Sequence, residues 1–487
     1  MTPPRRQLGL FVTAAIVIAN MIGVGVFTST GFQAASLHDP TTIIIAWIVG
    51  GVIALCGAAS YAELGSMMPK AGGEYVYLRE AYHPAVGFMS GWVSLTAGFS
   101  APIAAAALAF AKYLATLAPA LKTTAPWAAH TLAIGGTKLA TIAIGPEQVV
   151  AMVLIVLVTV MHSFDTKIGG WVQAAFTAAK VLLIVLFILG GLLIGTGDWG
   201  NFASQGGGLS NIGTSAFAIT LLYISLAYSG WNAAAYIAGD VVRPERNLPR
   251  SLLLGTGLVM ALYVLLNLVF LYAVPIEVLA GPPKGMPVIE VGDVAARHLF
   301  GDSAGKLVSS VIALALISAV SAMIMAGPRV YAAMAENHAL PARLATYNDR
   351  GVPVLAVVTQ GVLGCVFVLV GDLGALMRFV SFTLSVFAAL TVTALFVLRR
   401  RGLRGAYRTF GYPLTPILFI ASSVWIAYAQ IDQNPKESVI VGLLLLLGAG
   451  VYLATMRGRS PDAPPPSPGV PEARVVSSSD GSRSDDE

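Results

Sequence analysis

Long apolar stretches recur along almost the whole chain. Each has about 18 or more residues, enough for a helix that rises about 1.5 Å per residue to cross a hydrocarbon layer about 30 Å thick. Of the 487 residues, 56% are hydrophobic and only 11% are charged, whereas a soluble domain carries about 25% charged residues. These features exclude a water-soluble globule and predict an integral membrane protein with the lipid bilayer as its partner.

The apolar stretches predict twelve membrane-spanning helices. The segments 119–146 and 276–300 are interpreted as external loops with room for short interfacial helices, because a crossing at 119–146 would move every later basic loop to the other side. Residues 457–487, rich in Pro, Ser and Asp, are expected to form a disordered tail. The spans are placed at about residues 9–35, 41–67, 86–118, 147–163, 169–195, 211–239, 250–274, 305–335, 353–371, 374–398, 411–430 and 438–456.

Lys and Arg residues gather in alternate loops, such as the run 399–408, and in the segment 1–8. By the positive-inside rule this side, together with both termini, is expected in the cytoplasm. The net charge of +5 then reflects membrane orientation, and no nucleic-acid partner is expected. Cys56 and Cys365 both lie inside apolar spans, where a lone thiol behaves as a small hydrophobic group. Neither a disulfide framework nor a metal site is predicted.

Two spans contain interruptions near their middle. Residues 22–27 (Ile-Gly-Val-Gly-Val-Phe) interrupt the first span, and residues 227–232 (Ala-Tyr-Ser-Gly-Trp-Asn) interrupt the sixth. A helix break frees backbone N–H and C=O groups, which a bilayer tolerates only where they line a cavity. A freed helix N-terminus attracts a carboxylate and freed C-terminal carbonyls attract an ammonium group. Close packing of Gly is the alternative, but matching breaks in two halves favour a site for a free amino acid.

Lys180 lies near the middle of the fifth predicted span. A charge there costs about 2.5–3.5 kcal/mol on insertion scales, and the side chain is too far from either end of the helix to reach the interface. A buried partner for Lys180 is therefore expected. Glu63, Glu74, Asp165 and Asp240 fall at helix ends and are interpreted as gate or salt-bridge residues.

The sequence resembles the amino acid-polyamine-organocation superfamily and, within it, the L-type amino acid transporters and their bacterial relatives. The resemblance extends over about residues 8–457 and rests on the motifs at 21–27, 69–75, 227–232, 246–250 and 340–341. It implies an all-α membrane protein with twelve transmembrane helices, a five-plus-five inverted repeat (the leucine-transporter-like fold) and discontinuous helices 1 and 6. The repeats would span 9–195 and 211–398, with two further helices at 411–456, in a bacterial cell (inner) membrane.

The resemblance also implies a binding site. The substrate carboxylate would meet the break at 22–25, and the ammonium group would meet backbone carbonyls of the first and sixth helices. This chain has Val24 where many relatives have Ser, and Leu226 where relatives that prefer large side chains often have Phe. The implied substrate-binding residues are Ala19, Ile22, Gly23, Val24, Gly25, Leu226, Ala227, Ser229, Gly230 and Asn232.

Lys180 is implied to replace the sodium ion of sodium-coupled members of this fold. It would bridge the first and eighth helices through a carbonyl near Ile22 or Gly23 and a hydroxyl of Ser318 or Ser321. The hypothesis is that this lysine couples substrate binding to closure.

The function expected is sodium-independent secondary transport of amino acids by alternating access. Neutral L-amino acids are favoured because no membrane-embedded carboxylate is placed to receive a cationic side chain; a carrier of cationic amino acids or polyamines is the alternative. Exchange and proton symport stay open. A membrane enzyme would need clustered His, Asp or Glu in facing spans, and a channel would need a filter-like segment. The sequence shows neither pattern, so both classes are disfavoured. No cofactor is expected and, because the loop after the third span lacks cysteine, no disulfide-linked heavy chain.

Overall fold

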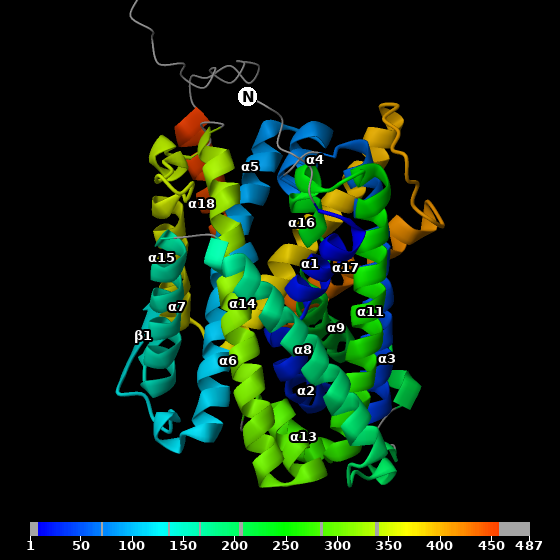
Figure 1. Ribbon diagram of the computed structural model, residues 1–487, viewed down its shortest axis with the longest axis vertical. Helices are drawn as coiled ribbons and strands as arrows, with labels where there is room; N and C mark the ends of the chain where they lie inside the picture. Colours follow the sequence, from blue (N-terminus) through cyan, green and yellow to red (C-terminus); the bar gives the residue numbers. More distant parts are fainter. Residues whose placement is uncertain are drawn as a thin grey trace, which may run out of the picture.

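A computed structural model describes residues 8–69, 72–134, 137–164, 167–203, 208–282, 286–336 and 340–456. Its helices form one bundle and run roughly along a common axis (Figure 1). The predicted tail at 457–487, residues 1–7 and Asp165 lie outside the described residues.

Helices make up nearly all of the described bundle. In chain order they are α1 (Leu10–Met21), α2 (Val24–Leu37), α3 (Pro40–Met67), α4 (Glu74–Ala81), α5 (Pro84–Val93), η1 (Ser94–Ser100), α6 (Ala101–Leu117), η2 (Pro119–Leu121), α7 (Pro146–Phe164), α8 (Lys167–Leu193), η3 (Trp199–Phe202), η4 (Gly208–Asn211), α9 (Ser215–Tyr228), α10 (Ala233–Tyr236), η5 (Ala238–Asp240), α11 (Pro244–Ala273), α12 (Ile276–Ala280), α13 (Val291–Phe300), α14 (Asp302–Glu336), η6 (Ala342–Ala345), α15 (Val354–Val370), α16 (Leu373–Arg400), α17 (Leu414–Gln433) and α18 (Pro435–Met456).

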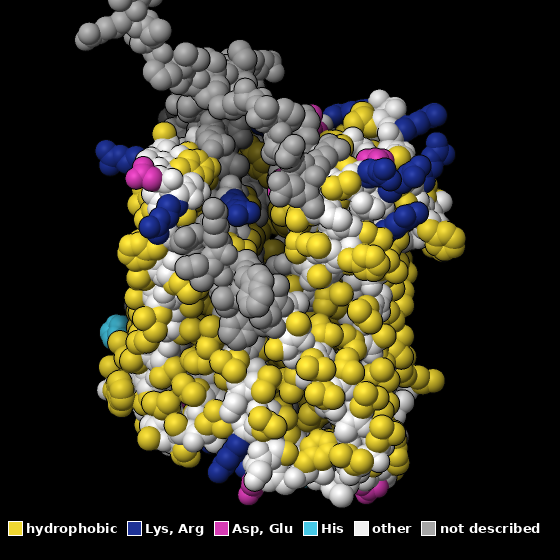
Figure 2. All heavy atoms as spheres, in the orientation of Figure 1, with side chains coloured by type: hydrophobic (Ala, Val, Ile, Leu, Met, Phe, Trp, Pro, Cys, Tyr) yellow, Lys and Arg dark blue, Asp and Glu magenta, His cyan; other side chains and the backbone are white. Residues whose placement is uncertain are grey.

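Nine helices within the described residues are long and apolar enough to cross a membrane. Three shorter apolar helices, at Thr177–Leu193, Ser215–Tyr228 and Val354–Val370, fall inside the fifth, sixth and ninth predicted spans. Apolar side chains cover the middle of the molecule as a broad band (Figure 2). An all-α membrane protein is therefore confirmed, whereas the count of twelve spans stays a prediction.

Local sequence signals set where several helices begin. Asp39 accepts a hydrogen bond from the Thr42 amide at 3.1 Å at the start of α3, and Asp372 accepts one from the Ala375 amide at 2.8 Å at the start of α16. Such side chains pair backbone N–H groups that the first helical turn leaves without partners. Proline occupies the first turn of α3, α5 and α11, where its missing N–H costs nothing.

The two loop predictions fared differently. Residues 276–300 hold the short helices α12 and α13, as expected. The 119–146 segment does not cross the bundle, but it forms an antiparallel hairpin of β1 (Ala128–Ile134) and β2 (Thr137–Ile144) rather than an interfacial helix. The sequence only left room for a short helix in this loop, and η2 (Pro119–Leu121) lies at its start. The hairpin was not foreseen, although the β-branched Thr and Ile of its strands suit this pairing.

The predicted third span is not one regular helix. Within it, α5 passes into the π-helical segment η1 and then into α6. The Ser100 hydroxyl donates to the Leu95 carbonyl at 2.6 Å. A π-helical segment shifts the register of the residues that follow, which sets the face that α6 turns toward the middle of the bundle.

Corresponding helices of the two predicted halves pack on each other. The pairs α2 with α9, α3 with α11, α6 with α14, and α7 with α15 are all in contact. A two-fold relation between the halves would bring equivalent helices together around its axis. The boundaries of the repeats stay a prediction, although these pairings agree with them.

The two ends of the bundle differ in charge. On the face shown in Figure 2, most Lys and Arg side chains lie at the top, and we call this end the basic end. The opposite end, at the bottom of Figure 1, carries the β1–β2 hairpin and α13, and we call it the hairpin end.

Candidate functional site

The first break separates α1 from α2. Helix α1 ends at Met21, Ile22 and Gly23 leave the helical conformation, and α2 begins at Val24 without a side-chain cap. The last carbonyls of α1 and the first amides of α2 therefore lack partners within their own helices. The predicted break is present, at the first two residues of the predicted 22–27 segment.

The second break follows α9. Ser229 has an extended ψ of 153°, and Gly230 has a φ of +94°, a conformation that only glycine adopts freely. A side chain at Gly230 would also come within 2.7 Å of the Asn20 carbonyl oxygen of α1. The chain continues as α10, a helix of only four residues. This position requires glycine for both its backbone angle and its close neighbour.

The two breaks lie against each other near the middle of the bundle. A Cβ placed on Gly25 would lie 2.4 Å from the Ala227 Cα and 2.7 Å from the Ala227 nitrogen. Only a residue without a side chain allows α2 and α9 to approach this closely. The segments that the sequence singled out far apart in the chain are thus brought into contact.

A cavity of about 60 Å³ lies at the breaks. Six of the predicted binding residues line it, whereas Ile22, Ala227, Gly230 and Asn232 do not. The six are Ala19, Gly23, Val24, Gly25, Leu226 and Ser229. The other lining residues were not predicted; they are Asn20, Met21, Pro102, Ala106, Ala319, Ala322 and Met323.

Backbone dipoles give the cavity two polarities. The N-terminus of α2 directs its first N–H groups toward it and carries partial positive charge, while α1 and α9 end there with partial negative charge. None of the lining residues is ionisable. An ion in this cavity would therefore be held mainly by the backbone.

Lys180 lies beside the first break. Its side chain is only 1% exposed, and its Nζ donates to the Ile22 carbonyl oxygen at 3.2 Å. Tyr263 donates to the neighbouring Met21 carbonyl at 2.7 Å. Two donors thus pair two of the carbonyls that the first break leaves free, those of Met21 and Ile22. The role of Lys180 as a sodium substitute stays a prediction.

The two serines predicted beside Lys180 both lie on α14. Ser318 is buried. Ser321 forms a 2.7 Å hydrogen bond with Nε2 of His162 on α7, so its hydroxyl joins α14 to α7. His162 itself is buried.

Glu74 connects the second break to the basic end. Its Oε1 accepts from Asn232 Nδ2 at 2.9 Å and from the Tyr61 hydroxyl at 2.7 Å. Burial raises the pKa of this carboxyl above its usual value, while the two hydrogen bonds act in the opposite direction. Asn232, predicted to lie at the edge of the substrate pocket, is directed to this carboxylate instead.

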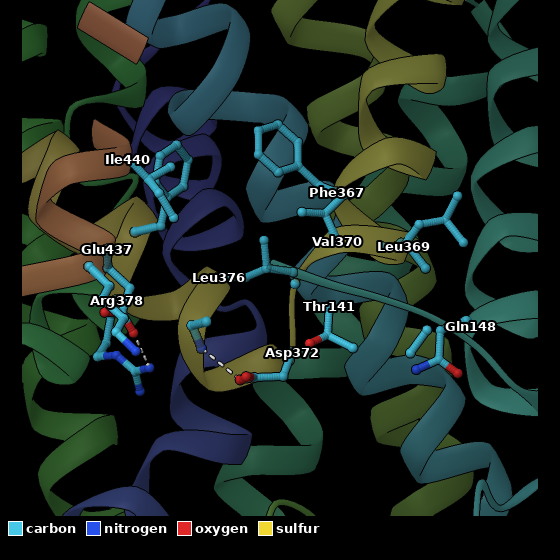
Figure 3. A pocket seen from close by; sticks show the side chains of 16 residues that line it. Thr141, Gln148, Phe367, Leu369, Val370, Asp372, Leu376, Arg378, Glu437 and Ile440 are labelled. Atoms are coloured by element: carbon cyan, nitrogen blue, oxygen red, sulfur yellow. Dashed lines mark hydrogen bonds and ion pairs between the residues drawn. The ribbon is translucent and has the colours of Figure 1, made fainter. Parts of the chain in front are cut away.

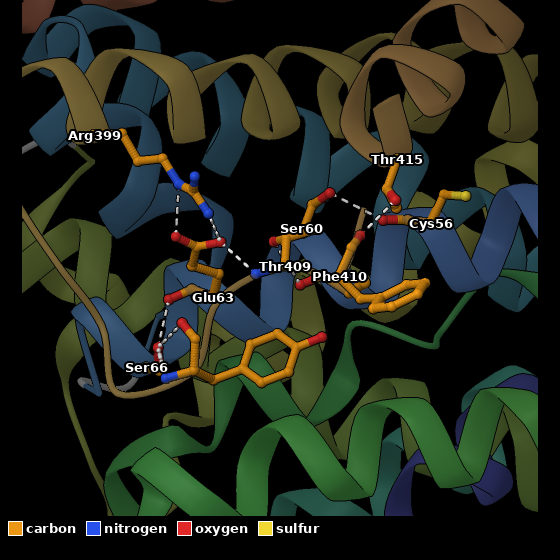
Figure 4. Close-up of polar contacts among 10 residues, drawn as sticks. Cys56, Ser60, Glu63, Ser66, Arg399, Thr409, Phe410 and Thr415 are labelled. Carbon is orange, nitrogen blue, oxygen red and sulfur yellow. Dashed lines mark hydrogen bonds and ion pairs between the residues drawn. The ribbon is translucent and has the colours of Figure 1, made fainter. Parts of the chain in front are cut away.

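A second acidic residue joins α3 to α16 (Figure 4). Glu63 accepts from Arg399 Nε at 2.8 Å and from a terminal guanidinium nitrogen at 2.7 Å. The Thr409 amide adds a third donor at 2.7 Å. The guanidinium also lies 3.6 Å from the centre of the Tyr412 ring. Glu63 is therefore a salt-bridge residue, in agreement with its interpretation from the sequence.

An aromatic pair joins α2 to α9 toward the hairpin end. The rings of Phe32 and Tyr223 stack with centroids 5.0 Å apart and planes 9° from parallel. The Tyr223 hydroxyl accepts from Arg378 of α16 at 2.9 Å, and Arg378 pairs with Glu437 of α18 at 2.7 Å. This chain of contacts links both broken helices to the outer helices.

No group of three or more His, Cys, Asp or Glu residues that could hold a metal ion occurs in the described ranges.

Two interrupted helices that face each other across a small cavity inside an apolar bundle define a membrane carrier.

Comparison with known proteins gives the family. A family model described as "Amino acid permease" matches residues 8–449. The chain is 29% identical to the "Serine/threonine exchanger SteT" of Bacillus subtilis, over 92% of this chain and 96% of that protein. It is 28% identical to the mouse "b(0,+)-type amino acid transporter 1", over 93% and 88%, and 27% identical to the mouse "Large neutral amino acids transporter small subunit 2", over 92% and 80%. The chain belongs to the amino acid permease family, and its function is amino-acid transport rather than catalysis.

Proposed function

We propose that this permease carries small neutral L-amino acids by alternating access, without sodium, and that the cavity between the two breaks holds the substrate. The observation that carries the proposal is the polarity of this cavity. The amides at the start of α2 suit the carboxylate, and the carbonyl ends of α1 and α9 suit the ammonium group.

The size and lining of the cavity support a short, uncharged side chain. Its 60 Å³ corresponds to about four to six water-sized spheres. Ala106, Ala319, Leu226 and Met323 contribute small or apolar side chains to its lining. With no carboxylate among the lining residues, a cationic side chain would be left unpaired, at a cost of several kcal/mol. The name of one relative, the serine/threonine exchanger of Bacillus subtilis, agrees with this choice.

Lys180 supports sodium independence. An ammonium group that already occupies the carbonyl of Ile22 supplies the positive charge that a bound cation would otherwise bring to the end of α1. We propose that Lys180 serves as this fixed cation in every transport cycle. Counterflow measured with and without an imposed pH gradient would distinguish substrate exchange from proton symport.

We propose that the basic end faces the cytoplasm. Support comes from the positive-inside rule and from the basic residues at this end, which include Arg243 before α11, Arg246 and Arg250 in the first two turns of α11, and Arg401 and Arg404 after α16. Labelling of single introduced cysteines with an impermeant maleimide tests the orientation: Asp198→Cys should react from outside intact cells, and Arg404→Cys only after the membrane is opened.

The same proposal holds that no disulfide-linked heavy chain is attached. The only cysteines, Cys56 and Cys365, lie within α3 and α15. A larger species on non-reducing gels that disappears with reductant would contradict this.

Transport in proteoliposomes tests the substrate. Vesicles preloaded with unlabelled L-serine should take up labelled L-serine at the same rate in sodium and in choline buffer. L-Alanine and L-threonine should compete, whereas L-arginine and putrescine should not. Leu226→Phe, which enlarges a lining side chain, should lower the apparent affinity for L-threonine more than for L-alanine. Sodium-dependent uptake, or competition by arginine equal to that by alanine, would contradict the proposal.

A further inference from the structure

Glu74 is a buried carboxyl group that has no cation beside it in the described part of the chain. The residue is 6% exposed, and it begins α4, which lies at the basic end of the bundle (Figure 1). Glu74 forms no ion pair with any described residue, and the buried Asp39 caps α3. The other buried acidic residues in the described ranges do form ion pairs, which are Glu63 with Arg399, Glu147 with Lys112 and Asp293 with Arg297.

The segment around Glu74 holds both ends of α10, the short helix after the second break. At the start of this helix, Asn232 Nδ2 donates to Glu74 Oε1 at 2.9 Å. At its end, the Tyr236 carbonyl accepts from the Gly72 amide at 3.2 Å. Helix α10 follows Ser229, which lines the substrate cavity. These contacts must therefore change if the cavity is to open toward the basic end.

Tyr61 of α3 holds the same place. Its hydroxyl donates to Glu74 Oε1 at 2.7 Å, and its ring packs edge-on against Trp231 with the centroids 4.7 Å apart. The hydrogen bonds from Asn232 and Tyr61 thus end on one oxygen of the carboxyl group. A proton on the other oxygen, Oε2, would leave both donors in place, so the neutral acid fits this closed arrangement.

The ionisable groups that interact electrostatically with Glu74 are tyrosines. They are Tyr61 of α3, Tyr77 of α4 and Tyr236 of α10. A phenol is neutral at physiological pH. These neighbours therefore offer hydrogen bonds but no positive charge.

The basic residues of the elements around α4 are exposed or engaged elsewhere. Helices α5 and α16 pack on α4, but His83 before α5 is exposed, and Arg399 of α16 is held by Glu63. On α4 itself, Arg79 is exposed. The N-terminus of α4 favours a negative charge on Glu74 only modestly, whereas burial of an unpaired carboxylate is costly. Burial therefore raises the pKa of Glu74 in spite of its two hydrogen bonds.

Water would reach Glu74 if the bundle opened at the basic end. A solvated carboxyl group regains its ordinary pKa, so a proton is bound more tightly in the closed arrangement than in the open one. By linkage, acid then stabilises the closed arrangement, and this stabilisation is lost as the pH rises through the raised pKa.

The hairpin end carries a contact of another kind. There Arg378 pairs with Glu437 at 2.7 Å, as Figure 3 shows, and Arg378 also donates to Tyr223 at 2.9 Å. A guanidinium group keeps its charge at all physiological pH values. A change of pH is therefore expected to act at the basic end rather than at the hairpin end.

We propose that Glu74 binds a proton while the substrate cavity is closed at the basic end and releases it when the cavity opens there. The proton passes to water and leaves the carboxylate; on closure a proton returns from the same side, so none crosses the membrane. Glu74 thereby regulates exchange, which slows in acid. This inference rests on the proposed function, because the cavity must hold the substrate and open at the basic end in each cycle.

The pH dependence of L-serine exchange in proteoliposomes tests this control. The wild type should exchange several times faster at about pH 8 than at about pH 5. Glu74→Gln keeps the shape and the acceptor oxygen but cannot titrate, so its rate should be equal at both pH values. Glu80→Gln, at an exposed position of the same helix, is the matched control and should keep the wild-type ratio of the two rates. Glu437→Gln, at the hairpin end, should also keep this ratio.

Tyr61→Phe tests the site independently of the folding of Glu74→Gln. This variant keeps the ring on Trp231 but removes one hydrogen bond to the carboxylate. The pH at which exchange accelerates should therefore rise by about one unit. An unchanged pH profile in Tyr61→Phe would contradict the assignment to Glu74.

Infrared difference spectra of the purified protein test the proton site without transport. Subtraction of the Glu74→Gln spectrum from the wild-type spectrum should leave the carbonyl band of one protonated carboxyl group. This band should disappear at a higher pH than the bands of exposed carboxyl groups.

Three results would overturn the proposal: absence of this band, a Glu74→Gln rate that varies with pH as in the wild type, or faster exchange in acid. A wild type that exchanges no L-serine at any pH would overturn the proposed function and, with it, the control of exchange. The infrared band would still show whether Glu74 holds the proton.

Discussion

Replacement of Gly25 by alanine perturbs the contact between the two broken helices directly. The added Cβ would lie 2.4 Å from the Ala227 Cα, whereas ordinary van der Waals contact begins at 3.4 Å. The helices α2 and α9 must therefore separate by about 1.0 Å. Because the obstructing atoms belong to the backbone and to the Ala227 Cβ, no side-chain rotation can relieve the clash.

The magnitude follows from the cost of overpacking. An extra methyl group in a closely packed interior costs about 1–3 kcal/mol. If the breaks must be in contact to hold substrate, this energy opposes the bound state and lowers affinity by about 5–150-fold. The same separation widens the distance between the α2 amides and the α9 carbonyls that are proposed to hold the two charges of one substrate molecule.

The assay is substrate exchange in proteoliposomes, with the apparent affinity for L-serine measured alongside the thermal unfolding midpoint. Gly257→Ala on α11 is the matched control, because nothing lies within 4 Å of its added Cβ. The control should exchange like the wild type. A Gly25→Ala protein that is folded and exchanges with unchanged affinity and rate would refute the proposed contact of the two breaks in the bound state.

Three further predictions concern buried charges. Lys180→Ala removes the donor to the Ile22 carbonyl and should abolish exchange in proteoliposomes; unchanged rates would discard its proposed role. Burial raises the pKa of Glu74, so the folded protein holds this proton more tightly than the unfolded chain, and the stabilisation is lost as pH rises through the raised pKa. Glu74→Gln should therefore raise the unfolding midpoint by about 1–3 °C near pH 8 and by less near pH 4; equal gains at both values would contradict this. Glu63→Gln should cost about 2 kcal/mol by leaving Arg399 without its carboxylate, and thermal unfolding of Glu63→Gln, Arg399→Gln and the double variant should show that the two losses are not additive.

The positions of both breaks could be predicted from the sequence. Gly23 and Gly230 interrupt apolar spans where a bilayer allows irregular backbone only around a cavity, and the structure has non-helical backbone at 22–23 and 229–230. The buried contact of Lys180 with the end of α1 was predictable for a similar reason. A charge that deep in a helix needs a polar partner, and broken helices expose carbonyls.

The remaining walls of the substrate cavity could not be predicted. Pro102, Ala106 and Ala319 are small residues on α6 and α14, and nothing in their local sequence separates a cavity wall from ordinary helix packing. The placement of Pro102 and Ala106 also depends on the π-helical segment η1, which changes the register of α6. The Glu74–Asn232 hydrogen bond was missed because it joins residues far apart in the chain through side chains alone.

A high-resolution cryo-electron microscopy map of the protein with bound L-serine is the most direct measurement. The account predicts ligand density between the two breaks, with the carboxylate at the amides of Val24 and Gly25 and the ammonium group at the carbonyl ends of α1 and α9. Ligand density elsewhere, or continuous helical hydrogen bonding through residues 22–23 and 229–230, would contradict it.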